Sequence, residues 1–163
     1  MTRWPFRLFA FAVLALAAHT AEAQTDADTQ TCLGALFAHV ASHGDDGATN
    51  NRAGVQLGIL PSGSNNVRGR QMAVTSGSGR DIIHLFDGIQ DMALIATYSI
   101  YPPAEATVLD AWAIDRRGQP LASLHVEQRQ RVLQPVDDPG VRQRFRDLMG
   151  RLLAGARVSS ICP

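Results

Sequence analysis

Hydrophobic residues recur at helical spacing near both ends of the chain. One apolar face near the N-terminus is formed by Leu33, Leu36, Phe37 and Val40. A second one, near the C-terminus, is formed by Val141, Phe145, Leu148, Met149, Leu152 and Leu153. The first spacing predicts a helix that is capped by Asp28 or Thr29 and stops at Gly44. Asp138 followed by Pro139 is a typical start for the second helix.

Between these two helices the hydrophobic pattern changes to a period of two residues, which is typical of β-strands. Stretches rich in Gly, Pro, Asn, Asp and Ser separate the alternating segments and indicate turns. The pattern predicts strands over residues 55–59, 67–74, 81–86, 92–101, 107–115 and 121–132. The polar stretch 45–52 is predicted to be an exposed loop, and the glycine- and serine-rich stretch 75–80 a hairpin turn.

The connections between successive strands are short, which favours antiparallel neighbours. We therefore predict an α+β fold with an antiparallel meander sheet of five to six strands. The N-terminal and C-terminal helices are expected to pack on one face of this sheet. Residues 24–163 are enough for one hydrophobic core, and no linker interrupts them, so a single domain is expected.

The first 23 residues have the parts of a secretory signal peptide. Arg3 and Arg7 precede an apolar stretch at residues 8–18, and Ala-Glu-Ala at 21–23 is a small-x-small cleavage site. The apolar stretch is short for a membrane span, and no later stretch is long enough for one. The mature protein is thus expected to begin at Gln24 and to work in a bacterial periplasm or outside the cell.

The two cysteines lie near opposite ends of the mature chain, at Cys32 and Cys162. An exported protein folds in an oxidising compartment, where a pair of cysteines forms a disulfide. One pair allows a single intramolecular connectivity. A redox-active pair would sit close in sequence, as in Cys-x-x-Cys, and these do not. We predict a structural disulfide that holds the two terminal helices together.

The charge of the chain argues against a nucleic-acid partner. The whole sequence has 15 basic and 15 acidic residues, and every basic residue is arginine. Removal of Arg3, Arg7 and Glu22 with the signal peptide leaves 13 basic and 14 acidic residues, a net charge of −1. A nearly neutral domain has no general attraction for DNA, RNA or an anionic membrane.

Two histidines four residues apart are the strongest candidates for metal binding. His39 and His43 project to the same side of the first predicted helix, and Asp45 follows, so two imidazoles and a carboxylate could hold a metal ion. The alternative is that both histidines are boundary residues on the flank of the apolar face. His84 and His125 lie in predicted strands and could complete the site if the fold brings them near.

Arginine and tyrosine side chains are the candidates for contact with a partner or an anion. The candidate residues are Arg68, Arg70, Arg116, Arg117, Tyr98 and Tyr101. Arginine suits anionic groups, and tyrosine is common at interfaces. The alternatives are a solvated surface for the arginines and a core strand that ends in a turn for the tyrosines.

No catalytic motif such as a nucleophile elbow or a phosphate-binding loop occurs in the sequence, and no cofactor is expected. We therefore predict a small exported protein of the bacterial cell envelope that is not an enzyme and acts by binding another exported protein. Two alternatives stay open. One is a metal-dependent hydrolase that uses His39 and His43, and the other is a small-ligand-binding domain that uses the sheet face away from the helices.

Overall fold

The computed structural model describes residues 27–48, 50–74, 79–99 and 108–162. The predicted signal peptide and Tyr101 lie outside these residues. The predicted turn at 75–80 also lies largely outside them, but the strands on either side of it pair with each other as expected. None of the helices in the described ranges is long and apolar enough to cross a membrane.

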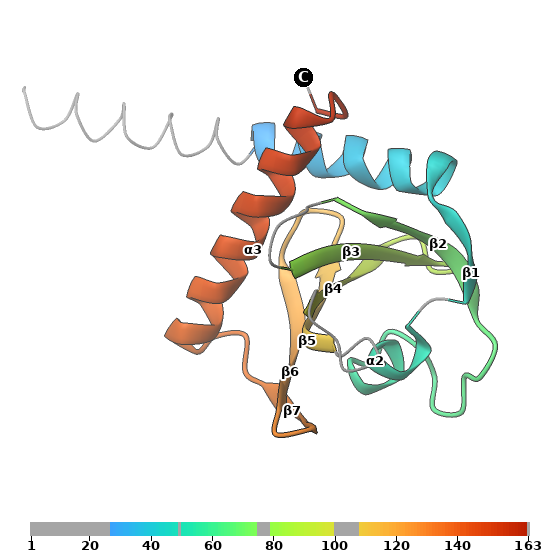
Figure 1. Ribbon diagram of the computed structural model, residues 1–163, viewed down its shortest axis with the longest axis vertical. Helices are drawn as coiled ribbons and strands as arrows, with labels where there is room; N and C mark the ends of the chain where they lie inside the picture. The colour runs from blue at the N-terminus through green and yellow to red at the C-terminus, as the bar shows by residue number, and fades with distance from the viewer. Residues whose placement is uncertain (1–26, 49, 75–78, 100–107, 163) are drawn as a thin grey trace, which may run out of the picture.

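The described strands form one antiparallel sheet whose spatial order follows the chain, from β1 to β7 (Figure 1). The strands are β1 (Asp45–Ala48), β2 (Arg68–Ala73), β3 (Gly79–Phe86), β4 (Met92–Ser99), β5 (Val108–Asp115), β6 (Pro120–Glu127) and β7 (Gln130–Gln134). The predicted α+β class and the antiparallel meander are therefore confirmed. The predicted number of five to six strands is wrong, because the sheet has seven.

The two additional strands come from places where the sequence carries weak signals. The segment predicted as one strand over 121–132 turns back at Gln128 and Arg129, whose φ angles are 47° and 68°. Such a two-residue turn usually contains Asn-Gly or Asp-Gly, so the residues Gln-Arg did not predict a turn here. The second addition is β1, which lies in the polar stretch predicted as a loop and pairs with β2.

The first predicted strand is also wrong, because residues 51–56 form a short helix, α2 (Asn51–Gln56). The side chain of Asn50 caps this helix by accepting a hydrogen bond from the Ala53 N–H at 3.1 Å. A Cβ atom at Gly54 would lie 2.9 Å from the Leu60 side chain, so glycine favours the close packing of the turn that follows. Hydrophobic alternation therefore came from a helix followed by a buried turn.

Two long helices cover one face of the sheet (Figure 1). The N-terminal helix occupies residues 27–43, and α3 extends over Pro139–Val158 with Asp138 as its N-cap. Both helices contribute to one core with the inward residues of β3 to β5, centred on Trp112, which packs against Phe145 with 5.1 Å between ring centroids. The predicted packing of both terminal helices on one face agrees with this core.

The opposite face of the sheet is also covered in the described structure. Its core is formed by α2, by the turn at 57–60 and by apolar residues of β3 to β6, including Phe86, Leu94 and Leu124. The meander is thus the middle layer of a fold with apolar contacts on both of its faces.

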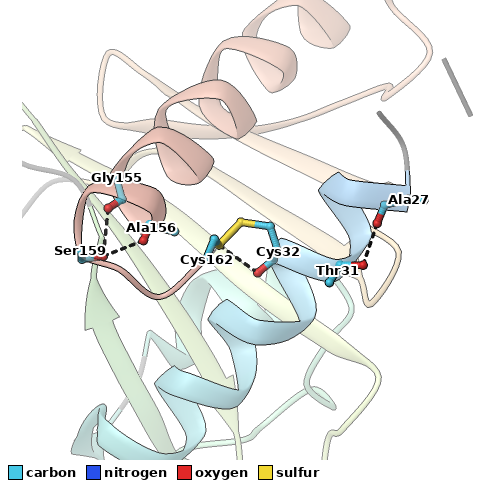
Figure 2. Close-up of a disulfide and its surroundings, with 7 residues drawn as sticks. All are labelled: Ala27, Thr31, Cys32, Gly155, Ala156, Ser159 and Cys162. Atoms are coloured by element: carbon cyan, nitrogen blue, oxygen red, sulfur yellow. Dashed lines mark hydrogen bonds between the residues drawn. A yellow bond between two sulfur atoms is a disulfide. The ribbon is translucent and has the colours of Figure 1, made fainter. Parts of the chain in front are cut away.

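A disulfide between Cys32 and Cys162 joins the two ends of the described chain, as predicted (Figure 2). The two Cα atoms are 5.1 Å apart, and both residues are buried. The Ser159 side chain donates to the carbonyl oxygens of Gly155 and Ala156 at 2.9 and 3.0 Å, which closes the last turn of α3 next to the bridge. The chain can therefore turn back from α3 to place Cys162 against the N-terminal helix.

Candidate functional site

A groove of about 550 Å³ lies between the N-terminal helix and the end of the sheet where β3 turns into β4. Its apolar lining includes Phe37 from the helix, Leu85 from β3, Ile89 from the turn and Met92 from the start of β4. Its volume falls within the range that is common for small-ligand sites, roughly 300 to 1,000 Å³. The groove is therefore large enough for a few side chains of a partner or for one small molecule.

Small residues on the N-terminal helix leave one flank of that helix open. Gly34, Ala38 and Ala41 follow one another at helical spacing and line the groove. A Cβ atom built at Gly34 would meet no other atom within 4 Å, so open space lies in front of this position. The adjacent stripe with Leu33, Leu36 and Val40 is fully buried in the core, and the same helix thus serves the core and the groove.

One arginine lies at each end of the groove. The Arg70 side chain donates from Nη1 to the carbonyl oxygen of Gly44, at the C-terminal end of the helix, at 3.1 Å. Arg116 belongs to the β5–β6 turn, and a Cβ atom at Gly118 in that turn would lie only 2.4 Å from Leu33 near the start of the helix. The groove therefore has a mainly apolar middle with a guanidinium at either end, and Asp87 is also part of its lining.

The two guanidinium groups differ in their present partners. Arg116 donates from Nε to the Gln90 carbonyl oxygen at 2.6 Å and lies 3.2 Å from Asp91 Oδ1, in a pair that is largely exposed. Among the described residues, no carboxylate lies within 4 Å of the Arg70 side chain. Arg70 can thus bind an anionic ligand without losing an ion pair. Arg116 would give up its exposed ion pair with Asp91, which solvent already weakens, for an ion pair with the ligand.

The other predicted contact residues do not line this groove. Arg68 lies 3.7 Å from Asp46 in an exposed ion pair, and Arg117 is an exposed residue of the β5–β6 turn. Tyr98 lies on the opposite face of the sheet, beneath α2. The structure therefore brings together two of the four predicted arginines, which are 46 positions apart in the sequence.

Tyr98 belongs to a buried polar network on the α2 side. The Asn50 side chain donates to the Tyr98 hydroxyl oxygen at 3.0 Å, and this hydroxyl lies 3.3 Å from His84 Nε2. This hydroxyl donates to Nε2 or accepts from it according to the imidazole tautomer. The other ring nitrogen, Nδ1, is buried and has no hydrogen-bond partner among the described residues.

Burial determines the protonation of this network. His84 is 2% exposed, and its desolvation lowers the pKa of the imidazole to about 4, so the ring is neutral near pH 7. Burial also raises the pKa of Tyr98, against the hydrogen bond from Asn50 and the positive charge of Arg131. The network is therefore uncharged at neutral pH and fixes the position of α2 on the sheet.

The predicted metal ligands are not completed by further residues. The rings of His39 and His43 stack with their centroids 4.4 Å apart. In the described ranges, no group of three His, Cys, Asp or Glu side chains is placed so that it could hold a metal ion. His84 and His125 lie on opposite faces of the sheet, so they do not meet. Metal binding by His39, His43 and Asp45 thus stays a prediction from the sequence alone.

A polar row under α3 was missed in the sequence. Asp81 is buried, accepts from Thr97 Oγ1 at 2.8 Å and forms an ion pair with Arg151 of α3 at 3.0 Å. In the same row, His125 Nδ1 lies 2.7 Å from Asp110 Oδ1. The hydrogen bond to Asp81 raises the pKa of Arg151. The contacts of Asp81 with Arg151 and Thr97 tie α3 to β3 and β4, and the His125–Asp110 pair joins β6 to β5. The position of Asp81 in phase with the core residue Ile83 was the available signal for this row.

Comparisons of this chain with protein-family models, with curated proteins and with solved structures found no match.

Proposed function

We propose that this protein is an exported, non-catalytic binding protein whose groove holds an acidic, apolar segment of another exported protein. The observation that carries the proposal is the groove itself, which combines an apolar floor with one guanidinium at each end. An apolar site with a few well-placed polar groups is the usual form of a binding site. Arginine is the cation best suited to bind a carboxylate, because its planar fork can donate two parallel hydrogen bonds.

The length of the groove limits the size of its ligand. The helix positions that line it, Gly34 to Ala41, cover about 10 Å at 1.5 Å per residue. An extended peptide rises about 3.3 Å per residue, so three to four residues match this length. The preferred segment therefore has a carboxylate side chain at each end and one or two apolar residues between them.

The disulfide supports the exported location. Cysteine pairs of this kind persist in oxidising compartments and are rare in the cytosol. Both alternatives from the sequence lack a comparable observation. For the metal-dependent hydrolase, no group of three possible metal ligands is found in the described part of the chain. For the small-ligand-binding domain, the sheet face away from the long helices is covered by α2 and residues 57–60.

A short labelled peptide tests the proposed specificity. We expect acetyl-Glu-Leu-Leu-Glu-amide with a fluorescent tag to bind the oxidised protein in a fluorescence-polarisation titration, and the Gln-Leu-Leu-Gln peptide to bind at least tenfold more weakly. Arg70→Gln and Arg116→Gln should each weaken binding of the acidic peptide about tenfold, because each removes one charge-assisted hydrogen bond. Arg117→Gln is the matched control and should leave the dissociation constant unchanged.

Gly34→Leu tests whether the peptide binds in the groove and not elsewhere on the surface. The new side chain has room at its Cβ and extends into the groove, so peptide binding should be lost while the helix gains a better helix-forming residue. Gly150→Leu on α3 is the control, since Gly150 is equally open but lies outside the groove. Undiminished binding to the Gly34→Leu protein, or equal binding of both peptides, would refute the proposal.

A further inference from the structure

The last strand of the sheet presents an open edge with two exposed large apolar side chains. β7 ends the strand order, so among the described residues only β6 pairs with it. Val132 and Leu133 are 44% and 60% exposed. Exposed apolar edge strands readily pair with another chain, and proteins usually protect them with charges, prolines or bulges. The opposite edge has such protection, because β1 is only four residues long and carries Asp45 and Asp46.

The hairpin register shows which peptide groups of β7 point outward. Glu127 pairs with Gln130 across a two-residue turn, so these two residues exchange both of their backbone hydrogen bonds. The alternation then assigns Gln130, Val132 and Gln134 to hydrogen bonds with β6. The N–H and C=O groups of Arg131 and Leu133 therefore point away from the sheet, and no turn, loop or cap in the described ranges supplies them with a backbone partner.

A second copy of this edge fits it in one antiparallel register. If the two-fold axis passes at Val132, Arg131 of each copy lies opposite Leu133 of the other, and four backbone hydrogen bonds form. An axis at Arg131 would place the two guanidinium groups opposite each other, which is unfavourable. An axis at Leu133 would place Arg131 opposite Pro135, which has no N–H to donate.

We propose that two copies of this chain associate through their β7 strands about a two-fold axis at Val132, joining their sheets into one. The two Val132 side chains then meet on the face that carries the long helices, and each Leu133 packs along the aliphatic part of Arg131 of the other copy. The contact is small, so the dimer is expected to dissociate on dilution. Because the axis is two-fold, the assembly closes at two copies.

A cysteine at Val132 tests this register directly. Residues on the axis form a non-hydrogen-bonded pair with Cα atoms about 4.5 Å apart, which is within the range for a disulfide. Val132→Cys should give a covalent dimer under mild oxidation, seen by non-reducing electrophoresis and intact mass. Leu121→Cys is the control, because Leu121 is similarly exposed but lies on β6, and it should stay monomeric.

Sedimentation equilibrium gives the second readout. The average mass of the oxidised wild-type protein should rise toward twice the monomer mass with concentration. Val132→Asp should raise the dissociation constant at least tenfold, because two carboxylates would face each other, and Val132→Thr should not. A monomer at all concentrations without cross-linking of Val132→Cys would overturn the proposal. A series of ever larger species would also overturn it, since that would indicate head-to-tail pairing of β7 with β1.

Discussion

Replacement of both Cys32 and Cys162 by alanine is expected to lower the free energy of unfolding by about 5 kcal/mol. The bridge closes a loop with a sequence separation of 130 residues, and the chain-entropy treatment assigns about this much to a loop of that length. The substitutions also remove two buried sulfur atoms from the core shared by the two long helices. Urea denaturation at neutral pH, followed by circular dichroism, measures the loss.

The wild-type protein under reducing conditions is the control for this experiment. It keeps both cysteine side chains but loses the bridge, so it should unfold at a urea concentration close to that of the double alanine variant. Leu36, Leu148 and Leu152 still bury the helix interface, so the variant should stay folded without denaturant if the total stability is typical. Identical denaturation curves for oxidised and reduced wild-type protein would contradict the prediction.

The free energy of unfolding should fall by about 3 kcal/mol between pH 6.5 and pH 4 because of His84 alone. The folded protein holds the pKa of His84 at about 4, whereas the unfolded chain has the ordinary value near 6.5. In this window the unfolded state binds the proton and the folded state does not, so acid favours unfolding. The full stabilising contribution is present above pH 6.5, decreases as the pH falls, and is gone below pH 4.

His84→Gln isolates this contribution. Glutamine does not titrate, and its side-chain oxygen can accept the hydrogen bond from Tyr98. Between pH 6.5 and pH 4, the slope of the free energy of unfolding against pH should therefore be much smaller for this variant than for the wild type. Urea denaturation at several pH values measures this slope. Other ionisable groups contribute equally to both proteins, so the difference between slopes reports on His84. Equal slopes for wild type and His84→Gln would show that the imidazole is not protected from protonation.

The sequence predicted the parts of the fold that depend on long, regular patterns. Both terminal helices have an apolar face repeated over several turns, and the cysteine pair allowed only one connection, so these features were confirmed. The short elements failed because tertiary packing decided them. Leu57 and Ile59 alternate as in a strand, but they are buried in the turn after α2, and Gln128-Arg129 adopts a turn conformation that its residue types do not favour.

From the sequence, two of the residues that line the groove could be named as candidates, but the groove itself could not be predicted. Arg70 and Arg116 were both candidates, but nothing local distinguished them from Arg68 and Arg117, since the choice depends on which strand ends lie beside the N-terminal helix. The small residues Gly34, Ala38 and Ala41 looked unremarkable because they lie beside the main apolar stripe. Their importance depends on what faces them, and that is a property of the assembled fold.

The positions of the two cysteines also limit when the disulfide can form. The strands pair with their neighbours in sequence, so hairpins can form one after another as the chain emerges from N-terminus to C-terminus. The N-terminal helix emerges first but packs against α3, which emerges last. Cys32 therefore has no partner thiol until Cys162 emerges, and an oxidant can close the bridge only after the whole sheet is available. Disulfide formation would then be a late step that stabilises a fold in which the sheet has already formed.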